Sequence, residues 1–97
     1  MPQVTVVARI RARPNAIEKV RDALLALVVP TVNKDDGCIN YDLYQDNDNP
    51  SLFFFLENWE SEELLKKHLD SEHIKAYRKE TEDLIEQRDL YRLTRIS

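Results

Sequence analysis

The segment from Leu52 to Trp59 constrains the fold more than any other part of the sequence. It is almost entirely apolar and contains three consecutive phenylalanines. A short apolar run bounded by turn residues is typical of a strand that is buried on both faces. If helices cover only one face of the sheet, a second copy of the chain is the simplest cover for the other. We therefore expect a homodimer in which Leu52, Phe54 and Leu56 face the partner.

Periodicity predicts a strand and a long helix in the first third of the chain. Residues Val4 to Ala12 place an apolar side chain at every second position, which indicates a strand. From Ala16 onward the apolar residues recur at helical spacing. We expect this helix to bend or end at Pro30, because proline lacks an N–H and clashes with the preceding turn. Gly37 then marks a turn.

Besides the apolar strand, the rest of the chain is expected to contain two strands and two short helices. Cys38 to Asp46 is the predicted second strand, before the apolar strand described above. One face of it is expected to carry three residues: Ile39, Tyr41 and Leu43. Ser61 and Ser71 are N-caps of successive helices, and the second helix is expected to reach Ile85. Leu90 to Ile96 alternates again and is the predicted last strand.

The resulting order is strand, helix, strand, strand, helical segment, strand. This is the split βαβ arrangement. We therefore expect an α+β fold of the ferredoxin-like type. Its 97 residues fit a single domain, residues 1–97.

Charge and composition exclude several classes of protein. The net charge is -4, and phosphate binding requires clustered basic residues, so nucleic acid is not an expected partner. Arg9, Arg11 and Arg13 do cluster, but they alternate along a strand and are interpreted as a solvated face. No apolar run has the roughly 18 residues needed to span a membrane. The first residues lack the pattern of a signal peptide, and Cys38 has no partner for a disulfide, so we expect a cytoplasmic protein.

The sequence offers little to bind a metal or a dinucleotide. His68 and His73 are five residues apart with a predicted break between them, and Cys38 is the only cysteine. This spacing does not suit a ligand set, so no metal site is expected. One glycine cannot form a glycine-rich phosphate loop, so neither flavin nor nicotinamide is expected as a cofactor.

The most informative cluster lies on the apolar strand. Four of its residues share one face by the period of two: Phe53, Phe55, Glu57 and Trp59. A buried carboxylate needs a partner or a raised pKa, so an acid at this position is unusual. Either Glu57 lies at the sheet margin and pairs with Arg or Lys, or Glu57 and Trp59 belong to an aromatic pocket with Tyr41 and one histidine.

Two histidines are candidates for that pocket. His68 lies among leucines on the inner face of a predicted helix, where it is either a satisfied core residue or a functional group. His73 lies near a helix start, where the helix dipole favours the neutral ring that can act as a base. Tyr77 lies on the inner face of the same helix, and we expect it to contact a substrate.

Three segments resemble the antibiotic biosynthesis monooxygenase family. They read VPTVNKDDGCINYDLYQD (29–46), FLENWESEELLKKHL (55–69) and SEHIKAY (71–77). They are most similar to the bacterial quinol monooxygenase branch, although Glu72 stands where that branch usually has proline. The resemblance implies a dimeric α/β-barrel in which two sheets pack back to back. It also implies a pocket between each sheet and its helices, in which a phenol or quinol loses a proton and reacts with O2 without a cofactor.

Other branches of the family match less well. Trp59 matches the pocket tryptophan of the aromatic-polyketide oxygenases, but Phe55 and Leu65 replace two of their polar residues. Haem degradation is not expected, because His68 and Arg78 replace the helix tryptophan and the axial histidine of haem-degrading members. A further branch isomerises a small phosphorylated signalling molecule, and the region of His68 and His73 resembles that branch equally.

The resemblance predicts a cofactor-independent monooxygenase that oxidises a quinol or a similar small phenol. In this hypothesis Glu57 or His73 takes the proton, with Trp59 as a third catalytic residue. The substrate ring is expected to contact five residues: Tyr41, Phe53, Phe55, His68 and Tyr77. The alternative is a small-molecule isomerase or a non-catalytic binding module on the same fold. A phosphate-binding cluster in the pocket would favour the isomerase, and its candidates are Arg9, Arg78 and Arg92.

Overall fold

The computed structural model describes residues 3–97 of the chain. Its elements are β1 (Val4–Ala12), α1 (Ile17–Lys34), β2 (Cys38–Gln45), β3 (Leu52–Trp59), α2 (Glu62–Leu69), α3 (Glu72–Thr81) and β4 (Ile85–Leu93). Met1 and Pro2, which begin the segment assessed for a targeting signal, lie outside the described residues. The order confirms the predicted α+β, ferredoxin-like arrangement.

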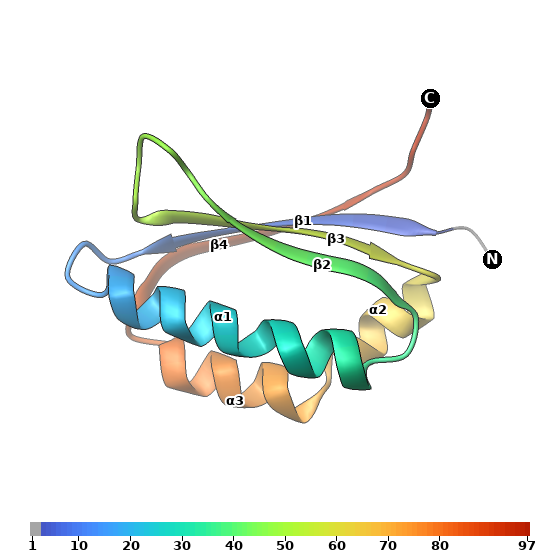
Figure 1. Cartoon of the computed structure of the whole chain (residues 1–97), viewed down its shortest axis with the longest axis horizontal. Coiled ribbons are helices and arrows are strands. Elements are labelled where there is room, and N and C mark those ends of the chain that lie inside the picture. The colour runs from blue at the N-terminus through green and yellow to red at the C-terminus, as the bar shows by residue number, and fades with distance from the viewer. Residues whose placement is uncertain (1–2) are drawn as a thin grey trace.

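The four strands form one antiparallel sheet in the order β2-β3-β1-β4. The apolar strand β3 is therefore central, which explains why its residues are apolar on both faces. All three helices lie on one side of the sheet, with α1 beside α3 (Figure 1). None of the described helices covers the other side.

The core lies between the sheet and α1. Alternate residues of β1 and β3 point toward the helices and are buried, and α1 contributes a stripe at helical spacing. The buried apolar residues of these elements include Val6, Val20, Leu24, Leu27, Phe53, Phe55 and Trp59. The inner faces of β1, α1 and β3 are those that periodicity predicted.

Pro30 does not end the first helix, which was one of the two outcomes expected at this residue. The helix continues through Pro30 to Lys34. Leu27 and Thr31 on either side of the proline are buried, and the N–H of Asp35 bonds to the carbonyl of Thr31. The hydrogen bond missing at Pro30 therefore lowers the stability of the helix locally, and the burial of Leu27 and Thr31 offsets this loss. The extra turn brings Asp35 to the ends of the other helices.

The predicted inner face of the second strand is wrong at one residue. The pairing of β2 with β3 shifts between Cys38 and Asn40, so Ile39 lies in an irregular part of the strand. Ile39 is 48% exposed, whereas Tyr41 is 4% exposed. A bulge of one residue interrupts the alternation of side chains between the two faces of the sheet. No residue type in the segment indicates that a bulge is present.

The boundary between the last helix and the last strand also differs from prediction. Helix α3 ends at Thr81, and Ile85 begins β4 rather than ending the helix. The strand therefore starts five residues before Leu90 and stops before Ile96. Because β4 is an edge strand, its first residues can be mostly polar, which hides the alternation that identifies a strand.

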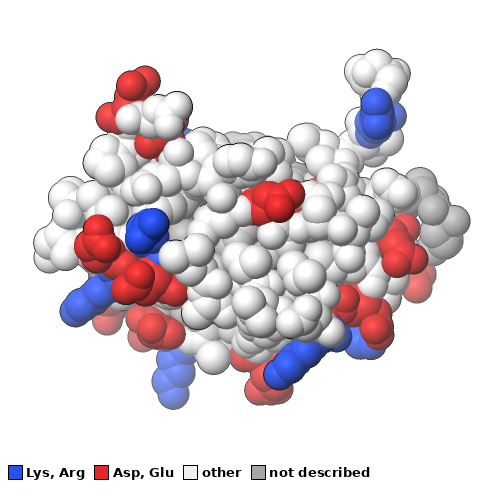
Figure 2. All heavy atoms as spheres, in the orientation of Figure 1, with Lys and Arg blue, Asp and Glu red and all other residues white. Residues whose placement is uncertain are grey.

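No helix within residues 3–97 is both long and apolar enough to cross a membrane. On the face shown in Figure 2, Lys and Arg side chains are interspersed with Asp and Glu. Arg9 and Arg11 lie on the open side of the sheet and are half-buried, and Arg9 pairs with Asp89 at 3.3 Å.

Candidate active site

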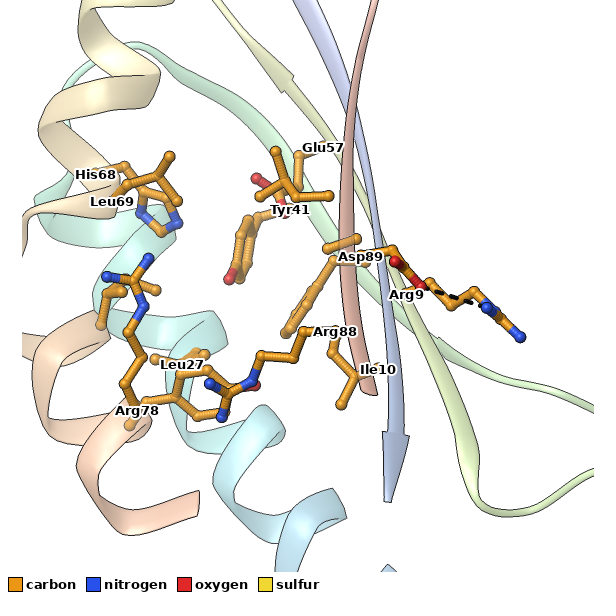
Figure 3. A pocket seen from close by; sticks show the side chains of 15 residues that line it. Arg9, Ile10, Leu27, Tyr41, Glu57, His68, Leu69, Arg78, Arg88 and Asp89 are labelled. Atoms are coloured by element: carbon orange, nitrogen blue, oxygen red, sulfur yellow. Dashed lines mark hydrogen bonds and ion pairs between the residues drawn. The ribbon is translucent and has the colours of Figure 1, made fainter. Parts of the chain in front are cut away.

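A cavity of about 240 Å³ lies between the sheet and the helices. The sheet contributes Tyr41 from β2 and Phe55 and Glu57 from β3, while α2 contributes His68. Figure 3 shows Tyr41 and Glu57 on the sheet side of the cavity and His68 on the helix side. The cavity thus combines aromatic walls with titratable groups, as small-molecule sites commonly do.

Glu57 lies inside this cavity rather than at the sheet margin. Its residue is 3% exposed, and its Oε1 accepts a hydrogen bond of 2.9 Å from Nε1 of Trp59. No Lys or Arg among the described residues forms an ion pair with it. Burial raises the pKa of Glu57 from 4.5 to about 7, against the opposing effect of the Trp59 hydrogen bond. The carboxyl group can therefore both accept and release a proton near neutral pH.

Tyr41 and Phe55 form an aromatic wall beside Glu57. Their rings stack with centroids 4.4 Å apart and an interplanar angle of 28°. Burial, followed by the nearby Glu57 carboxylate, raises the pKa of Tyr41 far above its ordinary value. Tyr41 therefore remains a neutral phenol that can donate a hydrogen bond, and the wall presents a flat surface to a ring.

A second polar group is built around Asp35, directly after α1. Its Oδ2 lies 2.5 Å from Nδ1 of His68 and 2.9 Å from Nε2 of His73. With Asp35 ionised, each imidazole donates an N–H to the carboxylate, which leaves Nε2 of His68 free to accept a hydrogen bond. Burial lowers the pKa of His68, although the bond to Asp35 opposes this effect. The cavity therefore contains a neutral, oriented imidazole.

Asp35, His68 and His73 also form a group that could hold a metal ion. Their donor atoms lie within 4.8 Å of one another. Two imidazoles and a carboxylate suit Zn²⁺ or Fe²⁺, and the third member of this possible ligand set, Asp35, cannot be recognised from the spacing of the two histidines. In this structure, however, the three groups already satisfy one another by hydrogen bonds. Cys38 is not part of the group, and burial raises the pKa of its thiol to about 11.

The structure separates the predicted site residues into two sets. Five of them line the cavity: Tyr41, Phe55, Glu57, His68 and Tyr77. Three do not line it: Phe53, Trp59 and His73. Phe53 and Trp59 are buried in the core, and Trp59 contacts two residues of the cavity wall, Glu57 through its hydrogen bond and His68 through its ring. His73 is half-buried behind Asp35.

Sequence reasoning did not identify Asp35, or Arg88 at the cavity wall. Asp35 lies in a polar stretch that ends a helix, and such residues are usually solvated. Its role depends on two histidines more than 30 residues later, as the separations of 33 and 38 residues show. Of the basic candidates, only Arg9 and Arg78 border the cavity, and the Arg9 side chain points away from it (Figure 3). Arg92 pairs with Glu62 instead.

Solved structures share this fold over nearly the whole chain. The protein PA3566 from Pseudomonas aeruginosa is 31% identical, with a TM-score of 0.93 over 100% of this chain and 97% of that one. The protein Rv0793 from Mycobacterium tuberculosis superposes with a TM-score of 0.89, covering 98% of this chain and 96% of that one.

Sequence comparison gives the family. Rv0793, a monooxygenase by name, is 38% identical over 82 residues, which are 84% of this chain and 79% of that protein. YgiN of Escherichia coli K12, a quinol monooxygenase by name, is also 38% identical and matches 76% of this chain and 80% of its own length. The profile of the antibiotic biosynthesis monooxygenases matches residues 3–80. The chain therefore belongs to the antibiotic biosynthesis monooxygenase family.

Proposed function

We propose that this protein is a cofactor-independent monooxygenase that oxidises a quinol or a similar small phenol with O2. The observation that carries the proposal is the cavity itself, in which Glu57 and His68 lie beside the stacked rings of Tyr41 and Phe55. Membership of the family and the names of its relatives support an oxidation of this kind.

In this proposal Glu57 accepts the proton of the substrate hydroxyl. A general base works best when its pKa is near the working pH, and the pKa of about 7 meets this condition. Proton transfer also neutralises a buried carboxylate, which burial favours. His68, oriented by Asp35, accepts a hydrogen bond from the second hydroxyl of a quinol through Nε2. His73 lies on the far side of Asp35 and acts on His68 only by holding that carboxylate.

The oxygen chemistry then needs no further reductant. The substrate anion transfers one electron to O2, and the two radicals combine to form a carbon–oxygen bond. Loss of water from the peroxide leaves a hydroxyquinone, so one oxygen atom enters the product and the other leaves as water. The substrate supplies all the electrons, which is consistent with the expectation that neither metal nor flavin takes part.

We also propose that the protein acts as a homodimer. The open side of the sheet carries Leu52, Phe54 and Leu56 from β3, and Val7 and Tyr91 pair across β1 and β4 on the same side. Leu56 and Tyr91 are 41% and 50% exposed in the single chain. A partner sheet on this side would remove an apolar surface from water.

Oxygen consumption tests the proposed activity. Metal-stripped protein is mixed with a panel of quinols in an oxygen electrode, and labelled O2 identifies the oxygen atom in the product. We expect uptake above the rate of spontaneous oxidation and one labelled atom in each product molecule. The variant Glu57→Gln, which retains an acceptor for Trp59, provides the control for folded but inactive protein. Uptake no faster than this control, or only after metal or flavin is added, would contradict the proposal.

A further inference from the structure

The cavity has a second chemical feature, a basic side, that the oxidation chemistry does not use. We propose that the natural substrate is an anionic aromatic compound, whose ring carries a carboxylate or a similar oxyanion bound by Arg78 and Arg88. The aromatic ring of this substrate is inferred from the proposed function, on which the inference rests. The anionic group is inferred from the two arginines.

Arg78 is the main support for the proposal. It belongs to α3 and lines the cavity, where Figure 3 shows its side chain on the helix side together with His68. Arg78 is an exposed residue, and within residues 3–97 its side chain forms no hydrogen bond and no ion pair. An arginine that borders an aromatic cavity without a carboxylate partner is available to a ligand.

Arg88 extends this basic side from the neighbouring strand β4. Its Nη2 donates a hydrogen bond of 2.7 Å to Oγ1 of Thr81, and its guanidinium lies 5.3 Å from the centre of the Tyr77 ring. Both contacts are to uncharged groups. They hold the guanidinium in place beside the cavity without neutralising its charge.

The acidic residues of the cavity do not cancel these charges. Asp89 also borders the cavity, but its carboxylate pairs with Arg9 at 3.3 Å, away from the cavity (Figure 3). Glu57 is protonated for part of the time near neutral pH, because burial raises its pKa to about 7. The cavity therefore has a basic side on a chain whose net charge is -4.

The positions of these groups fit one molecule with two different ends. In Figure 3 Arg88 lies at the opposite end of the cavity from Glu57, with Tyr41 between them. A ring against Tyr41 can therefore place its hydroxyl near Glu57 and its anionic group toward Arg88, while the Arg78 guanidinium borders the same cavity beside His68. The cavity volume of about 240 Å³ is below the roughly 300–1,000 Å³ of typical ligand pockets, which favours a substrate of one or two rings. Guanidinium groups bind carboxylates through paired hydrogen bonds.

Binding without turnover tests the proposal. Trp59 is the only tryptophan, and its ring lies 4.6 Å from that of His68, which lines the cavity, so its fluorescence reports binding there. Under anaerobic conditions the protein is titrated with gentisate, a hydroquinone with a carboxylate, and with gentisamide, its uncharged counterpart. We expect gentisate to bind at least about tenfold more tightly, as charge-assisted hydrogen bonds predict.

Variants assign this preference to the arginines. Arg78→Ala and Arg88→Ala should each weaken gentisate binding about tenfold to a hundredfold and leave gentisamide binding nearly unchanged. Arg88→Lys, which keeps the charge, covers the case in which Arg88→Ala unfolds the protein, and it should retain part of the preference. Arg21→Ala removes an exposed charge from α1 and is the matched control, with no expected effect.

Three results would overturn the inference. One is equal affinity of the parent protein for gentisate and gentisamide. Another is a variant Arg78→Ala that loses affinity for the two compounds by the same factor. The third is tighter binding of ribose phosphate than of gentisate, which would assign the arginines to a sugar phosphate and favour the isomerase. Tight gentisate binding without oxygen uptake would instead refute the oxidation and leave the anion site supported.

Discussion

Glu57 combines burial on a central strand with an exchangeable proton, and this has a consequence for stability. Its native pKa is raised from 4.5 to about 7. The folded state therefore binds this proton more tightly than the unfolded state. The resulting stabilisation is complete below pH 4.5, declines as the pH rises toward 7, and is absent above it.

The variant Glu57→Gln isolates this effect, because glutamine keeps an oxygen acceptor for Trp59 and cannot ionise. At pH 8 we expect the variant to be more stable than the parent by roughly 3 kcal/mol, at about 1.4 kcal/mol for each pKa unit. At pH 4 the difference should nearly vanish. Urea unfolding at both pH values measures it, and a difference that does not change with pH would contradict the assigned pKa.

The same titration predicts a pH profile for catalysis. If Glu57 is the general base, kcat/KM should rise as the pH passes 7, where the carboxylate forms. Glu57→Gln should lower kcat on the order of a hundredfold or more and should abolish this rise. Oxygen uptake between pH 5.5 and about 8.5 provides the measurement, after the rate of spontaneous oxidation without protein is subtracted at each pH. A rise that persists in the variant would assign the base elsewhere, with His68 as the next candidate.

Asp35 acts on the cavity only through His68, so it is a positioning residue. Asp35→Asn should lower kcat about tenfold to a hundredfold with a small change in KM, because the imidazole loses its fixed orientation. Nitrogen NMR shifts of the His68 ring should show a mixture of tautomers in place of one. Asp36→Asn is the matched control, since Asp36 is the exposed neighbour that pairs with Lys67. Equal effects of the two variants would rule out the positioning role.

At the residue scale, prediction from the sequence succeeded where a side chain and its neighbours belong to one strand. The alternation of β3 places Glu57 and Trp59 on one face, and the structure places them in hydrogen-bond contact. Prediction failed for Asp35, because its partners are on other helices. No local pattern in the polar stretch around Asp35 distinguishes it from a solvated turn residue.

At the scale of elements, the turn between α1 and β2 limits how the chain can pass from helix to strand. Gly37 has a φ of 78°, and a Cβ at this position would collide with the Leu64 side chain of α2. Gly37→Ala should therefore destabilise the protein by about 1–2 kcal/mol through the backbone conformation alone, and by more through the collision. Thermal or urea unfolding measures the loss.

A double variant separates the two causes. Leu64→Ala removes the side chain that the new Cβ would meet, so Gly37→Ala should be less destabilising in that background. The remaining loss reports the strain of the backbone. If Gly37→Ala destabilises both backgrounds equally, the contact with Leu64 plays no part.

The element boundaries also show what periodicity can and cannot predict. Alternation correctly gave β1, whose inner face is buried in the core, and the continuous apolar run correctly gave β3. Periodicity gave the wrong start for β4, where an edge strand tolerates polar residues, and the helix does not end at Pro30, whose local penalty is offset by burial of Leu27 and Thr31. In both cases tertiary packing overrides the structural preference of the local sequence.

At the scale of the whole molecule, the open side of the sheet contains both apolar and charged groups. Val7 lies between Leu56 and Tyr91 across the three strands β3, β1 and β4, and the Arg9–Asp89 pair lies beside them. The apolar composition of β3 on both faces predicts this surface from the sequence alone. The fold of a single chain does not explain the apolar residues on the open face of β3, because the helices bury only the other face.

A pair of matched variants tests whether the open side of the sheet is the dimer interface. Leu56→Glu introduces a charge at the centre of that side, where Leu56 is 41% exposed. A buried charge without a partner costs several kcal/mol, so this variant should sediment as a monomer at micromolar concentration while the parent sediments as a dimer. Val29→Glu makes a comparable change on α1, where Val29 is 64% exposed on the helix side, and this variant should remain a dimer. A parent that is monomeric at this concentration, or a Leu56→Glu variant that still dimerises, would show that the apolar strand is not explained by a partner sheet.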